Sequence, residues 1–329
     1  MTARATGGRD VVIEATRGSG RPGHAAWSWD VALSGVVPPL ISPLGRRGDP
    51  DGAAIRRLTE HVLAGGASGL FVLGGCGEGA WLTPSQRDAV VRAAVRAARG
   101  RVPVLAGVML PGTGPAVEAA RRAEAAGADA VVAGSPYYFG VDGEAQGRHI
   151  EAILGAVRVP LLLYNIPQST HHALSPETVA RLARDRRVLG LKDSAGDFQA
   201  FQRFLAVKRG RPDFRVLQGN ESLSAASLLL GGDGLVPGLG NVAPALFVAL
   251  RRAAALGDAA ACARHQAAIE ALARLYEQGH WLPALKAACA LLGLGDGRPA
   301  PPLAPANAER RRAVEAILNR QLDGRPGEA

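Results

Sequence analysis

The stretch GLFVLGGCGEGAWLTPSQRDAVVRAAVRAARGRVPVLAGV, residues 69–108, holds two short apolar runs on either side of a longer segment with helical periodicity. The runs at 69–75 and 102–108 have the length and the flanking glycines of buried strands. The middle segment begins with Thr83 as a helix N-cap and Pro84 in the first turn. This order predicts two parallel strands that are joined by a crossover helix.

The same alternation repeats along the chain and predicts its fold class. Several of the intervening helices begin with similar signals, as at Asp49 and Ser175. An open doubly wound sheet usually has about five or six strands, so the larger number here favours a closed (β/α)8 TIM barrel over residues 33–245. Residues 246–322 are expected to form C-terminal helices packed on the barrel, and 323–329 a short tail. The expected strands cover residues 35–41, 69–75, 102–108, 128–135, 159–165, 188–194, 214–220 and 233–241.

Composition and charge exclude several classes of protein. The chain has 47% hydrophobic residues, and none of its apolar runs reaches the roughly 18 residues of a membrane span, so no membrane partner is expected. The net charge of +9 comes from arginines spread along helical segments such as 87–101, without interleaved aromatic residues. This distribution favours solvated helix faces over a nucleic-acid surface.

The N-terminal residues and the cysteines bear on localisation. Residues 1–32 are rich in Gly, Arg and Ala and lack a sustained apolar segment, so we expect a disordered extension and no secretory signal. Acidic residues within it also disfavour an organellar transit segment. Cys76, Cys262 and Cys289 are odd in number and far apart, which favours a reducing compartment and a cytoplasmic protein.

Lys192 is the first candidate functional residue. It is one of only three lysines, against 35 arginines, and it lies at the end of the sixth expected strand, where barrel enzymes hold their active sites. Burial favours the neutral amine, which attacks carbonyl carbons, whereas arginine keeps its proton because its pKa exceeds about 12. The alternative is a structural ion pair with Asp193.

Tyr164 ends the neighbouring fifth strand, and we expect it beside Lys192. A phenol can carry protons to and from a reacting oxygen. The alternative is a tyrosine at the rim whose hydroxyl is only hydrogen-bonded. Its place next to a strand-end lysine favours the catalytic interpretation.

The glycine-rich turn GGCGEGA, residues 74–80, is a candidate anion site. Its backbone amides and the helix that follows favour a carboxylate, and the G-x-G-x-x-G spacing of a dinucleotide site is absent. Cys76 is a poor candidate nucleophile, because the only candidate histidines are His171 and His172, beyond the fifth strand. Gly219 and Val236, at the ends of the last two expected strands, are expected to border the same site.

We expect no metal and no resident cofactor. The seven histidines show neither H-x-H nor H-E-x-x-H spacing, and the strand ends lack a carboxylate cluster. A lysine that forms an imine needs no further group.

The motifs GGCGE, SPYY, YNIP, GLKDSAG and GGDGLVPGLGNVAP follow one another in order, and with them the chain resembles the dihydrodipicolinate synthase / N-acetylneuraminate lyase family of class I aldolases from about residue 35 to 322. The resemblance implies a Schiff base between Lys192 and a 2-oxo acid such as pyruvate, with Tyr164 as proton shuttle. It implies that the backbone amides of Gly75 and Cys76 hold the substrate carboxylate. Tyr138 matches a tyrosine that reaches a neighbouring subunit's site, which implies a third catalytic residue and a homodimer or homotetramer.

Two departures from the family pattern bear on the substrate. The turn of the synthases carries two hydroxyls where this chain has Gly75 and Cys76, and Ser169 stands where the synthases have an arginine. The motif KDSAGD resembles that of the catabolic members of the family, which cleave or dehydrate 2-keto-3-deoxy sugar acids or 4-hydroxy-2-oxoglutarate. The alternatives are a 4-hydroxy-tetrahydrodipicolinate synthase, which joins pyruvate to aspartate semialdehyde, and a non-catalytic homologue that binds 2-oxo acids.

Overall fold

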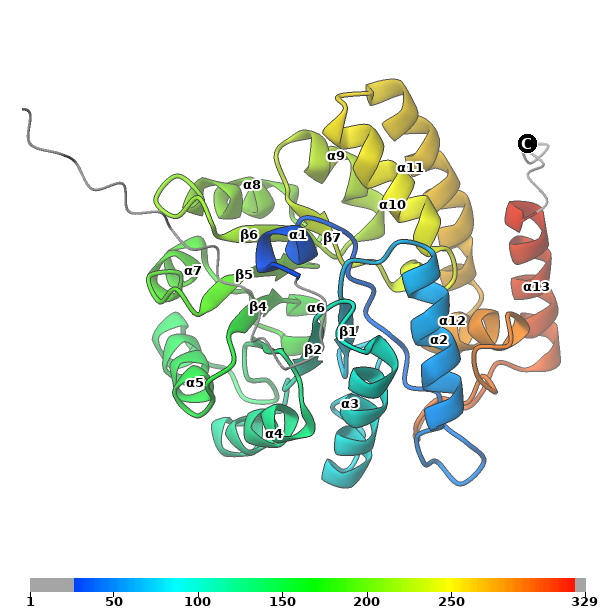
Figure 1. The fold of residues 1–329 in the computed structure, drawn as a ribbon, viewed down its shortest axis with the longest axis horizontal. Helices are drawn as coiled ribbons and strands as arrows, with labels where there is room; N and C mark the ends of the chain where they lie inside the picture. The colour runs from blue at the N-terminus through cyan, green and yellow to red at the C-terminus, as the bar shows by residue number, and fades with distance from the viewer. Residues whose placement is uncertain (1–26, 323–329) are drawn as a thin grey trace, which may run out of the picture.

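The centre of the molecule is a curled parallel sheet of seven strands that are neighbours in chain order (Figure 1). The computed structural model describes residues 27–322. Seven of the eight expected strands are present. Six lie within about three residues of their predicted ranges, but the strand expected over 233–241 covers only Gly234–Leu235, and Gly238–Asn241 forms a 3-10 helix instead. The strands are β1 (Leu70–Val72), β2 (Val104–Gly107), β3 (Ala130–Gly134), β4 (Leu161–Asn165), β5 (Val188–Asp193), β6 (Arg215–Gln218) and β7 (Gly234–Leu235).

The segment 35–41, expected as the first strand, differs from the prediction. It makes only isolated parallel bridges, through Val36 to β7 and through Pro39 to β1. Pro38 and Pro39 have no backbone N–H, so this segment cannot continue a hydrogen-bonded ladder. It nevertheless contacts both edge strands of the curled sheet.

Helices surround the sheet and connect its strands. The N-cap expected at Thr83 is confirmed, since its side chain accepts from Gln86 N and the two residues form a capping box. The connecting helices are α2 (Gly52–Ala64), α3 (Pro84–Ala98), α4 (Thr113–Ala126), α5 (Gly143–Gly155), α6 (Pro167–Thr170), α7 (Pro176–Leu182), α8 (Phe198–Val207) and α9 (Ser224–Leu229), with short 3-10 segments at η1 (Glu221–Leu223) and η2 (Gly238–Asn241).

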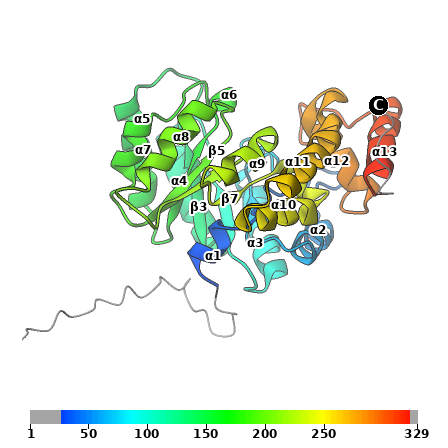
Figure 2. The same cartoon turned by 90° about the horizontal axis from the view of Figure 1, so that it is seen from above.

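The C-terminal part is helical, as the sequence predicts. It comprises α10 (Pro244–Ala255), α11 (Ala259–Ala273), η3 (Arg274–Glu277), α12 (Trp281–Leu291) and α13 (Ala308–Leu322). Helices α11, α12 and α13 gather at one side of the sheet (Figure 2). Helix α10 begins at Pro244 and therefore crosses the boundary placed after residue 245.

The N-terminal extension is described only in its last residues. Residues 1–26 lie outside the described part, but α1 (Trp29–Leu33) corrects the expectation that all of 1–32 is disordered. Trp29 and Leu33 stand one turn apart and are buried in the cluster inside the curl of the sheet. Figure 2 shows α1 and α6 at opposite ends of the sheet.

The core has two parts because strand side chains alternate between the two faces of the sheet. A large cluster lies between the sheet and the helices, and a smaller one, with Phe71, Leu105, Leu162 and Leu217, fills the inside of the curl. The side chains at the carboxyl ends of the strands continue the inward-facing rows of this smaller cluster. Between residues 27 and 322, no helix is long and apolar enough to cross a membrane.

Candidate active site

Lys192 and Tyr164 meet at the carboxyl ends of β5 and β4. The two residues are direct partners in the register of these strands. Lys192 Nζ lies 4.0 Å from the centroid of the Tyr164 ring and 5.1 Å from that of Phe71. Both Lys192 and Tyr164 are buried. The structure therefore brings together the two residues that the sequence singled out.

Asp193 is not the partner of this lysine. As the next residue on the strand it points to the other face, where its carboxylate accepts hydrogen bonds from Asn165 Nδ2 at 2.7 Å and Ala195 N at 3.3 Å. Burial raises the pKa of Asp193 to about 6. Among the residues that the structure describes, no carboxylate forms an ion pair with Lys192.

Glu221 follows β6, on the other side of Lys192 from β4. Its carboxylate accepts hydrogen bonds from Leu239 N at 2.8 Å and from the Tyr276 hydroxyl at 3.1 Å. Burial raises the pKa of Glu221, while the neighbouring Lys192 ammonium works in the opposite direction. A half-buried acid thus follows the strand next to Lys192 on the side away from β4, near enough for the two charges to influence each other.

Two glycines without side chains make room for Lys192 and Tyr276 at the site. A side chain at Gly219 would place Cβ 2.6 Å from Lys192 Cε, and one at Gly238 would place it 2.8 Å from the Tyr276 hydroxyl. Both positions are therefore restricted to glycine by the site itself. Val236, the other expected strand-end residue, is buried in the interior cluster with Tyr164.

The glycine-rich turn after β1 is folded tightly on itself. Leu73 and Glu78 have φ angles of 61° and 56°, in the left-handed region that most residues avoid. A Cβ at Gly77 would lie 2.6 Å from Leu73 N, and one at Gly79 would lie 2.1 Å from Leu73 O. Only glycine fits at these two positions.

Glu78 anchors this turn to the C-terminal helices. Its carboxylate forms an ion pair with Lys286 of α12, and both side chains are buried. Lys286 Nζ also donates to Ser42 O at 2.9 Å and to Arg298 O at 2.7 Å. Three chain segments that are distant in sequence are thereby fixed around one ammonium group.

Cys76 does not have the properties of a nucleophile. The side chain is buried, and burial raises the pKa of its thiol to about 12. A thiol with such a pKa holds almost no thiolate near neutral pH. The structure agrees with the sequence analysis, in which Cys76 is a poor candidate nucleophile.

A cavity of about 530 Å³ opens at the strand ends. Gly75 and Tyr164 line it, whereas Lys192, Cys76 and Gly219 are not among its lining residues. Since Lys192 Nζ packs on the Tyr164 ring, this tyrosine joins the lysine to the cavity. The lining residues are Leu73, Gly74, Gly75, Glu78, Gly79, Ala80, Trp81, Met109, Tyr137, Tyr164, Ile166, Ser169, Thr170, His280, Trp281 and Leu282.

Tyr138 lies apart from these residues. Its side chain is 81% exposed, its φ angle is +85°, and its ring packs edge-on against that of Phe139 at 4.9 Å. The preceding residue, Tyr137, lines the cavity instead. Within one chain, Tyr138 is therefore not brought to the candidate site.

Several residues of the site escaped the analysis of the sequence. Lys286 carried a usable signal, since it is one of only three lysines. Phe71 lies within β1, and the others reach the site from the C-terminal segments or from the loop after β1; nothing in their local sequence marks them. These residues are Phe71, Trp81, Tyr276, His280, Trp281 and Lys286.

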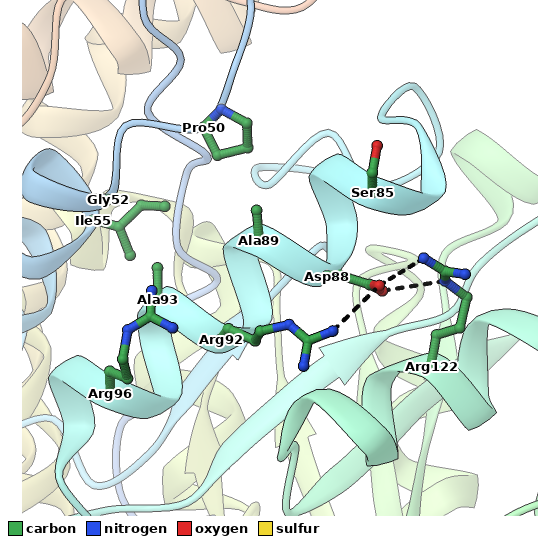
Figure 3. A pocket seen from close by; sticks show the side chains of 10 residues that line it. All are labelled: Pro50, Gly52, Ile55, Ser85, Asp88, Ala89, Arg92, Ala93, Arg96 and Arg122. Carbon is green, nitrogen blue, oxygen red and sulfur yellow. Dashed lines mark hydrogen bonds and ion pairs between the residues drawn. The ribbon is translucent and has the colours of Figure 1, made fainter.

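A second cavity, of about 430 Å³, lies between α2 and α3 on the outside of the molecule (Figure 3). Asp88 there contacts Arg122 at 2.6 Å and Arg92 at 3.6 Å. This second cavity shares no lining residue with the strand-end cavity. Over residues 27–322, no group of three or more His, Cys, Asp or Glu side chains could hold a metal ion.

The architecture is a parallel α/β sheet with a buried lysine and tyrosine at the carboxyl ends of its strands, where such folds place their ligands. The model of the Dihydrodipicolinate synthetase family matches residues 32–321. The chain belongs to this family, whose members include lyases and aldolases. The resemblance drawn from the motifs is thus confirmed.

Three relatives show the range of the family. The probable 2-dehydro-3-deoxy-D-pentonate aldolase YjhH of Escherichia coli is 35% identical over 293 residues, which cover 88% of this chain and 97% of YjhH. The 4-hydroxy-tetrahydrodipicolinate synthase of Salinibacter ruber is 35% identical over 294 residues, 88% of this chain and 95% of the synthase. The structure of YagE from Escherichia coli in complex with pyruvate is 30% identical, with a TM-score of 0.83 over 88% of this chain and 98% of YagE.

Proposed function

We propose that this chain is a Schiff-base-forming aldolase or lyase that acts on a 2-oxo acid of the pyruvate type. The observation that carries the proposal is the amine of Lys192, which is buried against the ring of Tyr164 at the strand ends, beside a cavity. A neutral amine can attack a ketone, whereas a guanidinium cannot. The pyruvate complex of YagE supports the choice of the 2-oxo acid.

The proposed reaction uses this chain's own residues in sequence. Lys192 Nζ attacks C2 of the 2-oxo acid, and loss of water leaves an iminium. Tyr164 accepts the proton of the C4 hydroxyl as the C3–C4 bond breaks, and the bonding pair moves into the iminium to form an enamine. The aldehyde leaves, C3 takes up a proton, and water releases pyruvate and the free amine. No resident cofactor is needed for these steps.

The proposal includes a closed (β/α)8 barrel in which the segment 35–41 takes the eighth place. Val37 N donates to Leu235 O at 2.8 Å, and Leu40 N donates to Phe71 O at 2.8 Å. These bonds join the segment to both edges of the sheet. In a barrel of this kind, the carboxyl ends of the strands form the active site.

The aldehyde released in the reaction is proposed to be neutral. The lining of the cavity includes no lysine or arginine, and Ser169 stands at the position where the synthases have an arginine. A carboxylate at the far end of the substrate would therefore lack a cationic partner. This favours cleavage or dehydration of a 2-keto-3-deoxy sugar acid over 4-hydroxy-2-oxoglutarate, and the relative YjhH supports that choice.

The second candidate is a 4-hydroxy-tetrahydrodipicolinate synthase. Relatives of that name, such as the one from Salinibacter ruber, match the chain as well as YjhH does. Ser169 and the missing hydroxyls at Gly75 and Cys76 argue against it. Consumption of aspartate semialdehyde together with pyruvate would distinguish the two.

We also propose a homodimer or homotetramer. Tyr138 and Phe139 are 81% and 74% exposed, and an exposed aromatic pair of this size suits a subunit interface. The three cysteines are free and buried, which supports a reducing, cytoplasmic setting. Light scattering on the wild type and on Tyr138→Ala tests the assembly.

Borohydride reduction in the presence of pyruvate tests the chemistry. We expect a mass increase that peptide mapping places on Lys192, and no increase in Lys192→Arg. Lys208→Arg is the matched control, because Lys208 is partly exposed and pairs with Asp233 away from the cavity. Absence of the adduct would overturn the proposal, while an adduct without turnover of any aldehyde would favour the non-catalytic homologue.

A further inference from the structure

The second cavity, on the outside of the molecule, has a positively charged wall. Three guanidinium groups line it, those of Arg92 and Arg96 on α3 and that of Arg122 on α4. The only carboxylate in this wall belongs to Asp88. Three positive charges against one negative charge leave an excess of two positive charges in a concave site. An anion is therefore the kind of ligand that this cavity favours.

Asp88 satisfies only one of these arginines. Arg122 donates to it twice, from Nε to Oδ1 at 3.3 Å and from Nη2 to Oδ2 at 2.6 Å. Arg92 Nη2 lies 3.6 Å from the same Oδ2, which is within the range of an ion pair but too long for a hydrogen bond. Within residues 27–322, Arg96 takes part in no hydrogen bond and no ion pair. Two guanidinium groups thus present N–H donors to the cavity without an acceptor from the described part of the chain.

The three arginines are placed to bind an anion from more than one side. Arg92 and Arg96 stand one turn apart on α3, while Arg92 and Arg122 approach Asp88 from different helices (Figure 3). Like charges at a spacing of four residues on a helix repel each other. An anion that accepts hydrogen bonds from Arg92 and Arg96 offsets this repulsion, and the nearby Arg122 adds to the attraction.

The rest of the wall indicates a small phosphate ester, and not a nucleic acid or an inorganic anion. It holds the Ser85 hydroxyl and the apolar side chains of Pro50, Ile55, Ala89 and Ala93, with no aromatic residue on which a base could stack. A volume of about 430 Å³ suits a small organic molecule and exceeds the needs of an inorganic anion. A phosphate monoester carries about −1.5 to −2 charges at pH 7, which matches the excess positive charge. Its oxygens also fit the planar fork of a guanidinium group.

We propose that the second cavity is a binding site for a small phosphate monoester. The phosphate oxygens accept hydrogen bonds from Arg92 and Arg96, and the organic group packs on the apolar side that Ile55 provides. Arg122 stays bonded to Asp88 and contributes through its charge. This inference goes beyond the proposed function and does not depend on it, because the two cavities have no lining residue in common.

Isothermal titration calorimetry with glycerol 3-phosphate tests the site, at about 20 mM ionic strength so that screening is weak. We expect one molecule bound per chain, no binding of glycerol, and at least about tenfold weaker binding of succinate, a dianion without the phosphate geometry. Arg92→Ala and Arg96→Ala should each raise Kd by about tenfold, the usual loss for a hydrogen bond between charged groups. Arg96→Lys keeps the charge but not the fork, so it should recover only part of this loss.

Asp88→Asn gives a prediction of opposite sign. It removes the negative charge from the wall and frees Arg122, so Kd for glycerol 3-phosphate should fall severalfold. A variant that merely failed to fold could not bind more tightly. Arg264→Ala is the matched control for the arginine variants, because Arg264 is an exposed arginine on α11 that does not line the cavity. Its Kd should equal that of the wild type.

Lys192→Arg shows whether the ligand binds at the strand ends instead. Its Kd for glycerol 3-phosphate should equal that of the wild type, and a loss of binding in this variant would overturn the inference by placing the phosphate in the strand-end cavity. No binding up to about 10 mM ligand would also overturn it. The same holds for equal affinities for succinate and glycerol 3-phosphate, for an unchanged Kd in both Arg92→Ala and Arg96→Ala, and for weaker binding in Asp88→Asn.

Discussion

Lys192 Nζ lies 4.0 Å from the centre of the Tyr164 ring because β4 and β5 pair in register at these two residues. Their separation is therefore set by backbone hydrogen bonds of the sheet and not by a mobile loop. Both side chains are buried, so neither has room to adopt many rotamers. A pair that is fixed in this way is preorganised for a reaction in which an amine and a proton carrier must act on the same carbon chain.

Replacing Tyr164 by Phe should separate the two roles of this side chain. The ring, its contact with Lys192 and its packing on Phe71 remain, while the hydroxyl is lost. We expect kcat to fall by about 10²- to 10⁴-fold, the usual contribution of a general acid or base. The midpoint of thermal unfolding should stay close to that of the wild type. Steady-state kinetics and calorimetry give these values, and a variant with the kcat of the wild type would exclude Tyr164 as the proton carrier.

Much of this arrangement could be predicted from the sequence because strands in a parallel sheet end at a common edge. The apolar runs of β4 and β5 placed Tyr164 and Lys192 at that edge, and the structure agrees. The prediction of a strand over residues 35–41 was wrong, because Pro38 and Pro39 lack the backbone N–H groups that a hydrogen-bonded strand needs. The apolar pattern around them is nevertheless that of a strand. The position of Tyr138 depends on its backbone, whose φ of +85° turns it outward and leaves Tyr137 on the cavity.

The buried pair of Glu78 and Lys286 should contribute strongly to stability. Removing one partner, as in Lys286→Met, leaves a buried carboxylate without its cation and should cost about 3–5 kcal/mol of unfolding free energy. Adding Glu78→Gln to this variant removes the unpaired charge and should recover a large part of the loss. Urea denaturation of the two variants provides the comparison.

Lys208→Met is the control for this pair, because Asp233 keeps Arg215 as a second cation at 3.3 Å, so this variant leaves no buried carboxylate unpaired and should lose much less stability. If the single Lys286 variant and the double variant lost the same stability, charge burial would not be the cause. No local pattern could reveal this pair, since its members belong to the turn after β1 and to α12. Only the packing of the C-terminal helices brings them together.

The buried carboxyl of Asp193 should make stability depend on pH. Burial raises its pKa to about 6, above the value of about 3.9 in an unfolded chain, so the native state binds more protons than the unfolded state between these values. The contribution of Asp193 to the free energy of unfolding is fully present below pH 4. It is lost as pH rises through 6, by about 2–3 kcal/mol in all. The Asp193→Asn variant has no carboxyl to ionise and so lacks this loss. Its free energy of unfolding should therefore rise relative to that of the wild type between pH 4 and pH 7.5.

The difference between the variant and the wild type is the quantity to measure, by urea denaturation at several pH values. His149 titrates over the same range in the opposite direction, since burial lowers its pKa to about 4. Its effect cancels when Asp193→Asn is compared with the wild type at each pH. A difference that stays constant from pH 4 to pH 7.5 would show that Asp193 ionises normally.

Gly75 is the position at which the turn can regain a hydroxyl. A Cβ built there meets no atom within 4 Å, and the residue lies on the cavity wall together with Tyr164. Threonine should therefore fit without strain, unlike a side chain at Gly77, which would meet Leu73 N at 2.6 Å. A hydroxyl at this position could pass protons to and from Tyr164, so Gly75→Thr should raise kcat, by about tenfold or more where proton transfer limits the rate.

Gly75→Ala separates the hydroxyl from the added bulk. It carries the same Cβ without a donor, so it should leave kcat unchanged, and both variants should unfold at or slightly above the wild-type midpoint because glycine is more flexible when unfolded. Gly77→Ala is the steric control and should lower the midpoint. The solvent isotope effect on kcat reports the proton step and should shrink in Gly75→Thr only. If the threonine and alanine variants had the same kcat, Tyr164 would work without a relay through this turn, and the loss of its hydroxyls would be neutral for the chemistry.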